Sequence, residues 1–352
     1  MNNEELLRHI RSTELNTIDN DVEHEKSMRY YSLGDMGNEI DGQSKVKSTD
    51  VFDLVESDMP SHVRTFLGHD DIMEFKPENS TDSAKAEAQE KTDYINHIIK
   101  SQSDSYMTQF SWLKGAELYR YSAVTFGYEE SESVIEKEFR NVSVEEGEEI
   151  EITANLQAEA GAEIEFVKQV LKLFIYEVSL RVSIKSTNGS YFVRYIQPDR
   201  FKISKDAISV SESEIVGHDE YLRKYELVDL GYSEEVVKDL PSSSEHGHST
   251  DWSGEIVLVE YRYIKGVGPG ITKVTIVSST ILEREQVEIF PYAVLSATPL
   301  PGQMIGLSRA DAAIETQDLK TALLRQTINN MYQVNSARMA VNSRVNKDDL
   351  LS

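Results

Sequence analysis

The chain of 352 residues contains no cysteine, no long apolar run and few basic residues for its size. The absence of cysteine excludes disulfides, iron–sulfur clusters, cysteine-ligated zinc and a cysteine nucleophile, and it fits a reducing compartment. Apolar runs such as residues 173–176 and 256–259 are far shorter than the roughly 18 to 20 residues that cross a bilayer. The first 15 residues lack a basic region followed by an apolar one, so no signal peptide is expected. We therefore expect a soluble protein that has no membrane partner.

The shortage of basic residues makes the chain strongly acidic. It has 36 Lys and Arg against 61 Asp and Glu, which gives a net charge of −25. This balance argues against a general basic surface for nucleic acid or an anionic membrane, while it leaves room for a local basic site. The length allows two or three domains.

Motifs for nucleotide, ester and metal chemistry are absent or incomplete. There is no G-x-x-x-x-G-K-[ST] loop, and the glycine cluster at 266–270 lacks the lysine–hydroxyl pair, so it is predicted to be a turn. A nucleophile-elbow pattern begins before Ser308 but has Ala310 where the second glycine belongs. His246 and His248 lie in a Ser/Gly-rich stretch that is typical of a solvated loop. We expect no enzyme activity, no cofactor and no metal site.

The N-terminal third changes from polar to helical. Residues 1–45 are predicted to form a mobile polar arm that leads into short helices. Between residues 83 and 118, apolar residues recur at spacings of three and four, which predicts amphipathic helices. Residues 118–128 are aromatic and β-branched and predict a strand. Residues 129–165 hold 13 Glu and two basic residues, a local net charge of −11 that is typical of a solvated loop.

The middle of the chain has the pattern of antiparallel hairpins. Segments 173–184 and 191–196 flank a Ser-Thr-Asn-Gly-Ser stretch at 186–190, which predicts a hairpin because Asn-Gly tolerates positive φ. A second hairpin is predicted within residues 255–279, around the glycine cluster. Between the two, residues 224–231 predict a short helix closed by glycine.

The clearest helix of the sequence follows Pro301-Gly302. Ser308 supplies an N-cap, and Asp311 supplies an acid three residues later. No Gly or Pro interrupts residues 308–345, and about 30 helical residues would make a rod about 45 Å long. Apolar residues follow the rod at Leu319, Leu323, Leu324, Ile328, Met331 and Tyr332. Such a helix is far longer than is usual in a globular domain, so we expect an elongated or assembled structure.

The same helix differs in charge from the rest of the chain. From residue 319 to residue 347 the only ionised side chains, a total charge of +5, are those of Lys320, Arg325, Arg338, Arg344 and Lys347. Two interpretations stay open. The cations are either solvated positions that complement the helix dipole, or a contact strip for an acidic neighbour or nucleic-acid phosphate.

Residues 301–311, 317–327 and 329–332 resemble the portal proteins, or head–tail connectors, of tailed bacteriophages, in particular those of short-tailed phages and related prophages. They are similar to the family's G-x-S-x-A-D, Q-x-x-K-T-x-L-x-R-Q and D-N-x-Y series, with Asn329 in place of the last aspartate. Further similar phrases lie at 91–99, 197–204, 231–242 and 281–285. The resemblance covers about residues 45–352.

The resemblance implies a structural, non-enzymatic protein that forms a ring, typically of twelve subunits, at one vertex of the phage head. Double-stranded DNA would pass through the centre of the ring. The implied partners are further copies of the chain, the large terminase subunit that does the ATP chemistry, a capsid or scaffolding protein and a tail adaptor. The implied location is the virion, with the host cytoplasm during assembly.

The resemblance also implies an α+β, ring-forming fold, with a portal-like wing of helices and antiparallel hairpins followed by a long stem helix. We expect a polar arm at 1–45, the wing at 46–302, the first stem helix at 303–338 and the start of a clip domain at 339–352. Family chains usually run several hundred residues further. We therefore expect a fragment, a split gene, or a chain whose remaining clip, second stem helix, tunnel loop and crown are supplied separately.

Within this architecture, four cations of the stem are candidate subunit contacts or transient contacts with DNA phosphate: Lys320, Arg325, Arg338 and Arg344. Ser308 and Asp311 are expected to cap the stem helix. The alternative is an independent acidic α+β protein with a binding or enzymatic role. A terminase or major capsid gene beside the coding sequence would fit only the portal interpretation.

Overall fold

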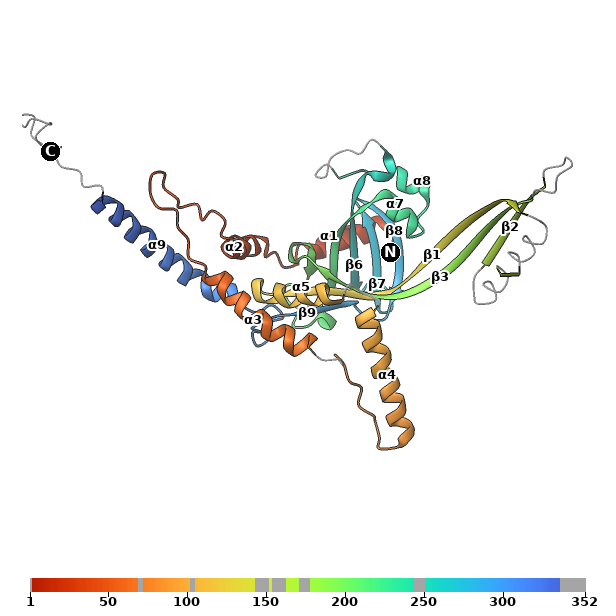
Figure 1. Cartoon of the computed structure of the whole chain (residues 1–352), viewed down its shortest axis with the longest axis horizontal. Coiled ribbons are helices and arrows are strands. Elements are labelled where there is room, and N and C mark those ends of the chain that lie inside the picture. Colours follow the sequence, from red (N-terminus) through yellow and green to blue (C-terminus); the bar gives the residue numbers. More distant parts are fainter. Residues whose placement is uncertain are drawn as a thin grey trace, which may run out of the picture. The chain divides into compact units, whose positions relative to one another are not determined.

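The computed structural model describes residues 2–68, 72–101, 105–142, 152–153, 163–170, 178–243 and 251–335. It combines α-helices with antiparallel sheets, in agreement with the predicted α+β class (Figure 1). The chain divides into two compact units. Unit 1 consists of Met1–Ile72, Tyr106–Thr125 and Tyr195–Ser352, and unit 2 consists of Met73–Ser105 and Phe126–Arg194.

Unit 1 contains most of the regular elements. Its longer helices are α1 (Asn3–Glu14), α2 (Asp21–Tyr31), α3 (Asp50–Leu67), α5 (Ser105–Leu118) and α9 (Arg309–Asn335). Its short helices are α7 (Lys224–Asp229), α8 (Glu234–Lys238), η1 (Pro198–Arg200), η2 (Val210–Glu212) and η4 (Trp252–Gly254). Its strands are β4 (Phe201–Ile203), β5 (Ile215–Arg223), β6 (Ile256–Lys265), β7 (Ile271–Val277), β8 (Thr280–Val287) and β9 (Tyr292–Leu295). None of the helices in the described part of the chain has the length and apolar character that a membrane span requires.

The centre of unit 1 is an antiparallel sheet of five strands in the order β4-β5-β6-β7-β8. The predicted hairpin within 255–279 is confirmed as β6 and β7, whose Lys265 and Ile271 form the last pair before the turn. Gly266 and Gly270 have φ values of 83° and 93°, which only glycine adopts without strain. The local turn chemistry therefore placed this hairpin correctly.

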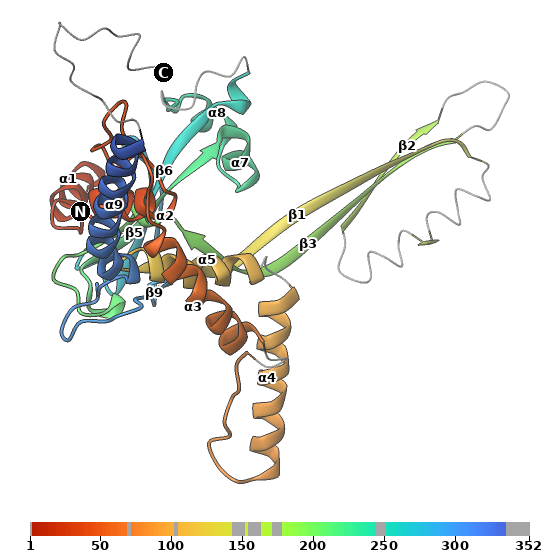
Figure 2. The same cartoon turned by 60° about the vertical axis from the view of Figure 1, so that its left-hand side comes forward.

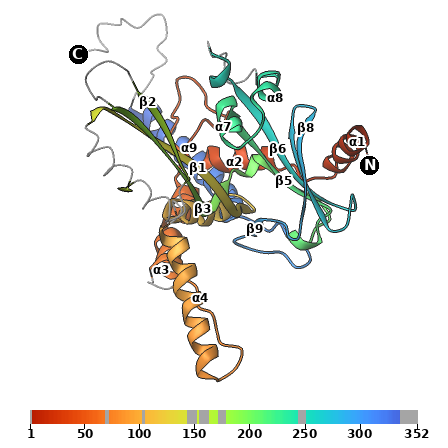
Figure 3. The ribbon, with the colours of Figure 1, turned by 90° about the vertical axis from the view of Figure 1, so that its right-hand side faces the viewer.

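Helix α1 covers one face of this sheet (Figure 3). Leu6 and Ile10, one helical turn apart, are fully buried against Ile264 and Ile276 of the sheet. Burial of a side chain of this size contributes about 1.5 to 3 kcal/mol. The predicted mobile arm at 1–45 is therefore wrong at its start, because two well-spaced apolar residues dock the first helix on the core.

An ionic cluster reinforces the docking of α1. Arg262 of β6 is nearly buried, and its guanidinium lies 2.5 Å from Glu14 of α1, 2.6 Å from Asp219 of β5 and 3.5 Å from Glu260. Arg11 of α1 donates to both carboxylate oxygens of Glu260, at 2.6 and 3.0 Å. Two guanidinium groups thus meet three carboxylates between the helix and the sheet.

The opposite face of the sheet carries the short helices. Residues of β6 alternate in direction, so Val257 and Val259 face away from α1 and pack with Leu227 of α7 and Val237 of α8. Helix α7 ends before Gly231, which has a φ of 94°. The predicted short helix closed by glycine is confirmed.

Helix α2 places an uncharged histidine in the core. His24 is 7% exposed and makes edge contacts with Tyr119 and Tyr121, at ring-centroid distances of 5.1 and 5.4 Å. Within the described residues, neither ring nitrogen has a hydrogen-bond partner. Burial lowers the pKa of His24 to about 4. The positive charge of Arg120 lowers this pKa further, whereas the negative charges of Asp199, Asp19 and Asp311 raise it.

Unit 2 contains α4 (Asp82–Ser101), β2 (Glu163–Val170) and most of two long strands, β1 (Ser122–Val142) and β3 (Val178–Ile196). The predicted helical region at 83–118 is confirmed by α4 and α5. Thr92 and Asn96 lie one turn apart on α4 and bind the segment that precedes the helix. Thr92 Oγ1 accepts from the Phe75 N–H at 2.9 Å, and Asn96 Oδ1 accepts from the Met73 N–H at 3.1 Å.

The predicted solvated loop at 129–165 is wrong for its first part, since β1 continues to Val142. Strand β1 lies beside β3 in the order β2-β3-β1-β9, and this pairing satisfies backbone groups whatever the charge of the side chains. Most of the remaining acidic segment, residues 143–151 and 154–162, lies outside the described residues.

The predicted hairpin at 186–190 is also wrong, because β3 runs unbroken through these residues. Gly189 serves close packing instead of a turn. A Cβ on Gly189 would lie 1.7 Å from the Tyr128 hydroxyl, and the Tyr128 ring lies 5.0 Å from that of Tyr191. Glycine within a strand often marks such a close approach. The same arrangement recurs at Gly127, where a Cβ would lie 2.8 Å from the Phe192 ring.

Candidate functional site: helix α9 and its strap

The start of α9 is fixed by a reciprocal cap. The Asp311 backbone N–H donates to Ser308 Oγ at 2.9 Å, and the Ser308 backbone N–H donates to Asp311 Oδ2 at 3.1 Å. Burial alone would raise the pKa of Asp311, but hydrogen bonds from Arg120 and from the Ser308 N–H hold that pKa below its ordinary value. These two residues were predicted as the cap, and the structure places them within reach of each other.

The first half of α9 is anchored by apolar packing. Ala310, Ala313 and Ile314 form a cluster with Val51 of α3, and Leu54 packs against it. Helices α3 and α9 lie side by side (Figure 1). The small alanines let the two helices approach closely at this point.

Gln317 carries a buried polar contact at the end of this cluster. Its side chain is fully buried, its Oε1 accepts from the Val51 N–H at 2.8 Å, and its Nε2 donates to the Tyr30 carbonyl at 3.2 Å. A buried carboxamide with both ends satisfied specifies how α9 sits against α2 and α3.

Beyond Gln317, α9 is accompanied by residues 33–49, the connection between α2 and α3, which we call the strap (Figure 2). Its last part runs antiparallel to α9, as its hydrogen bonds with successive turns show. Thr321 Oγ1 accepts from the Ser48 N–H at 3.0 Å, Arg325 Nε donates to the Val46 carbonyl at 2.9 Å, and Asn329 Oδ1 accepts from the Ser44 N–H at 2.7 Å. With Gln317, these residues repeat every four positions, which places them along one side of the helix.

Two of the four candidate cations are engaged by the chain itself. Lys320 pairs with Asp50, the first residue of α3. The Arg325 guanidinium donates to Asn38 at 2.6 Å and to Glu39 at 2.9 Å. The other two candidates, Arg338 and Arg344, lie outside the described residues.

The second half of α9 leaves its apolar residues uncovered. Ile328 is half-buried, whereas the large apolar residues exposed over 43–76% of their surface are Leu319, Leu323, Leu324, Met331, Tyr332 and Val334. The ionised side chains between Leu319 and Asn335 are those of Lys320 and Arg325, both paired within the chain. This part of α9 is therefore an exposed helix surface without uncompensated charge, which is unusual in a chain of net charge −25.

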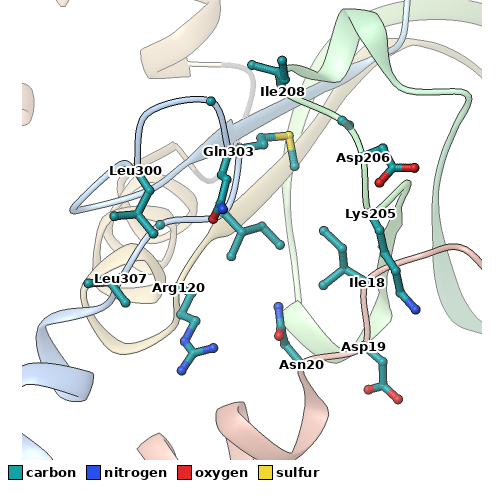
Figure 4. Close-up of a pocket in the computed structure, with 15 residues that line it drawn as sticks. Ile18, Asp19, Asn20, Arg120, Lys205, Asp206, Ile208, Leu300, Gln303 and Leu307 are labelled. Carbon is teal, nitrogen blue, oxygen red and sulfur yellow. The ribbon is translucent and has the colours of Figure 1, made fainter.

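A pocket of about 680 Å³ lies beside the start of α9. Residues 18–20, 205–208 and 302–307 line it, together with Arg120 and Leu300 (Figure 4). Ile18 points into it, whereas the charged ends of Asp19, Lys205 and Asp206 point away from its centre. The arrangement differs from a catalytic site, where titratable groups converge. In the part of the chain that the structure describes, no group of three His, Asp or Glu residues is placed to hold a metal ion.

The strap is the part of the site that sequence reasoning missed. The signal was present as the four-residue repeat of Gln317, Thr321, Arg325 and Asn329. A polar repeat shows that one side of a helix binds something polar, but its partner segment has no regular secondary structure and no periodic pattern that would identify it.

Comparison with known proteins gives one clear match. The model of the Phage SU10 portal protein family matches residues 8–255 and 269–352. The match begins within α1, well before the residue at which the resemblance was expected to start. No curated protein matches the chain.

Proposed function

The chain belongs to the Phage SU10 portal protein family, and on that premise we propose that it forms a ring-shaped DNA channel at one vertex of a phage capsid. The observation that carries the proposal is the exposed surface of α9 between Leu319 and Asn335, whose two cations are both paired within the chain. A closed ring needs a surface on each subunit that its neighbour covers. An exposed helix surface with six large apolar residues fits this requirement.

Burial of this surface would strongly favour assembly. Removing a leucine or methionine side chain from water contributes about 1.5 to 3 kcal/mol. Several such residues on each subunit supply a favourable term large enough to offset the cost of association. We propose that α9 is the first stem helix and that it packs against neighbouring subunits.

For the domain organisation, we propose a wing at 46–302, a stem segment at 303–338 and the start of a clip at 339–352. The expected stem helix was placed too early at its start, because the described helix of this segment, α9, begins at Arg309 after the Ser308 cap and is described to Asn335. Because α1 packs on the central sheet of unit 1, we extend the proposed wing beyond 46–302 to include this first helix, Asn3–Glu14. The proposed partners are further copies of the chain, and microscopy of the assembled particle would count them.

The acidic composition suits passage of DNA through a channel. Each phosphate neutralised by Lys or Arg adds salt-dependent adhesion, so a lining of net negative charge lets the duplex slide. We propose that the chain acts as a structural channel during packaging, alongside a large terminase subunit, a capsid or scaffolding protein and a tail adaptor. Contacts of the stem cations with DNA phosphate stay a prediction.

The test is self-association of the purified chain, measured by light scattering and by negative-stain electron microscopy. The wild-type chain should form closed rings. Leu323→Glu, at a position 55% exposed on α9, should weaken association at least about 100-fold, which corresponds to about 3 kcal/mol of lost burial and added charge.

Leu230→Glu is the matched control, because Leu230 is 53% exposed and lies after α7, away from α9. It should associate like the wild type. A wild-type chain that stays monomeric at every concentration, or an equal effect of the two substitutions, would contradict the proposal.

A further inference from the structure

The strap is bound to α9 through polar contacts. None of the residues 33–49, all of which the structure describes, is buried, and the strap has no helix or strand. Its apolar residues Ile40 and Val46 are 57% and 38% exposed. A segment held by hydrogen bonds at the surface, with few buried apolar contacts, opens at low free-energy cost.

The strap and the residue after it carry the counter-charges of α9. Glu39 of the strap lies 2.9 Å from Arg325, and both side chains are nearly buried, at 12% and 11% exposed. Asp50 pairs with Lys320. Hydrogen bonds from the Met36 N–H and, against a desolvation penalty, from Arg325 lower the pKa of Glu39 to about 2. Glu39 is therefore ionised at neutral pH.

Release of the strap would change the character of the helix surface. Lys320 and Arg325 are the ionised residues of α9 beyond Leu319 within the described chain. Release of the strap removes Glu39 and so frees Arg325, and loss of the Asp50 charge at the start of α3 would also free Lys320. Burying an unpaired cation in a contact between subunits costs several kcal/mol. The same surface would then resist the packing for which its leucines are suited.

We propose that Glu39 and Asp50 act as built-in counter-charges that make α9 competent to pack against a second copy of the chain. The inference rests on the proposed function, because it assumes that α9 is a contact between subunits. Attachment of the strap, which brings Glu39 to Arg325, then controls assembly. Glu39 and Asp50 need no direct contact with the neighbouring subunit, because they act by neutralising Arg325 and Lys320.

The test compares the wild-type chain with the double variant Glu39→Gln/Asp50→Asn, which keeps side-chain size and removes both counter-charges. Light scattering should show association weakened at least tenfold. Hydrogen exchange should become faster in the strap, where the N–H groups of Ser44 and Ser48 bond to α9. Asp41→Asn is the matched control, since Asp41 is a fully exposed strap acid that pairs with Lys45 at 2.9 Å. It should leave both measurements unchanged.

A quadruple variant distinguishes the effect of the unpaired cations of α9 from the effect of a loosened strap. Adding Lys320→Gln and Arg325→Gln to Glu39→Gln/Asp50→Asn removes the freed cations, so association should return towards the wild-type value even while the strap exchanges fast. Wild-type association of the double variant, or failure of the quadruple variant to recover, would overturn the inference. A monomeric wild-type chain would instead overturn the proposed function on which it rests.

Discussion

Replacing Arg262 by methionine tests the ionic cluster that docks α1 on the sheet. The guanidinium of Arg262 is 3% exposed and contacts Glu14, Asp219 and Glu260. It also donates to the carbonyls of His218 at 3.0 Å and Tyr261 at 3.2 Å. Methionine fills similar space without charge, so the substitution removes the central cation and leaves Arg11 alone with three carboxylates.

The expected loss of stability follows from the burial of the acids that remain. Glu260, Glu14 and Asp219 are 9%, 17% and 20% exposed, so each is poorly solvated once its partner is gone. Breaking a buried ion pair by removing one partner costs about 3 to 5 kcal/mol. Arg11 is 43% exposed, and Arg11→Met should cost only about 1 kcal/mol because water replaces much of the lost interaction.

Urea unfolding followed by circular dichroism measures the difference. With an m-value of about 3 kcal/mol per M, a loss of about 4 kcal/mol lowers the midpoint by more than 1 M urea. Hydrogen exchange should show α1 released first in Arg262→Met. The reasoning is refuted if Arg262→Met costs less than about 1 kcal/mol, or if Arg11→Met costs as much as Arg262→Met.

Two further predictions concern unit 2 and the core of unit 1. Gly189→Ala should displace the Tyr128 ring and destabilise the paired strands β1 and β3 by about 1 kcal/mol. In a Tyr128→Ala background, the same substitution should cost almost nothing. Additive losses of stability in this double-mutant cycle would contradict the close approach of Gly189 and Tyr128. His24 should make the folded state acid-sensitive, because its pKa is about 4 when folded and about 6.5 when unfolded. Its contribution to the free energy of unfolding is therefore complete above pH 6.5 and is lost as the pH falls towards 4. The loss is at most about 3.4 kcal/mol, and His24→Phe should unfold with a weaker pH dependence between pH 6.5 and pH 4. Equal pH dependence in both chains would exclude His24 as the cause.

Elements determined by neighbouring residues could be predicted from the sequence. The hairpin of β6 and β7 follows from Gly266 and Gly270, and the start of α9 follows from Ser308 and Asp311, three residues apart. The strand through Gly189 was missed because its local Asn-Gly signal is overruled by the Tyr128 ring, which the sequence places 61 positions earlier.

The errors at α1 and at the stem cations have the same origin. Spacing of Leu6 and Ile10 hinted at a helix, but the sheet residues that bury them lie more than 200 positions away. Likewise, the sequence identified Lys320 and Arg325 as unusual in charge, while their acidic partners are separated from them by 270 and 286 positions. Local sequence patterns therefore identify residues that are unusual in apolar spacing or in charge, but contacts between residues distant in the sequence form only in the folded structure.

The hydrogen bonds between the strap and α9 also define a register. The three α9 residues that bond the strap alternate in chemistry, since Thr321 and Asn329 accept from N–H groups and Arg325, which lies between them, donates to a carbonyl. A slip of the strap by one contact would move it about 6 Å along the helix and place Arg325 opposite an N–H group that it cannot bind. The length of the strap therefore sets how far along α9 it covers the helix. An insertion or deletion in residues 33–49 would shift the position along α9 beyond which the strap no longer covers the helix surface.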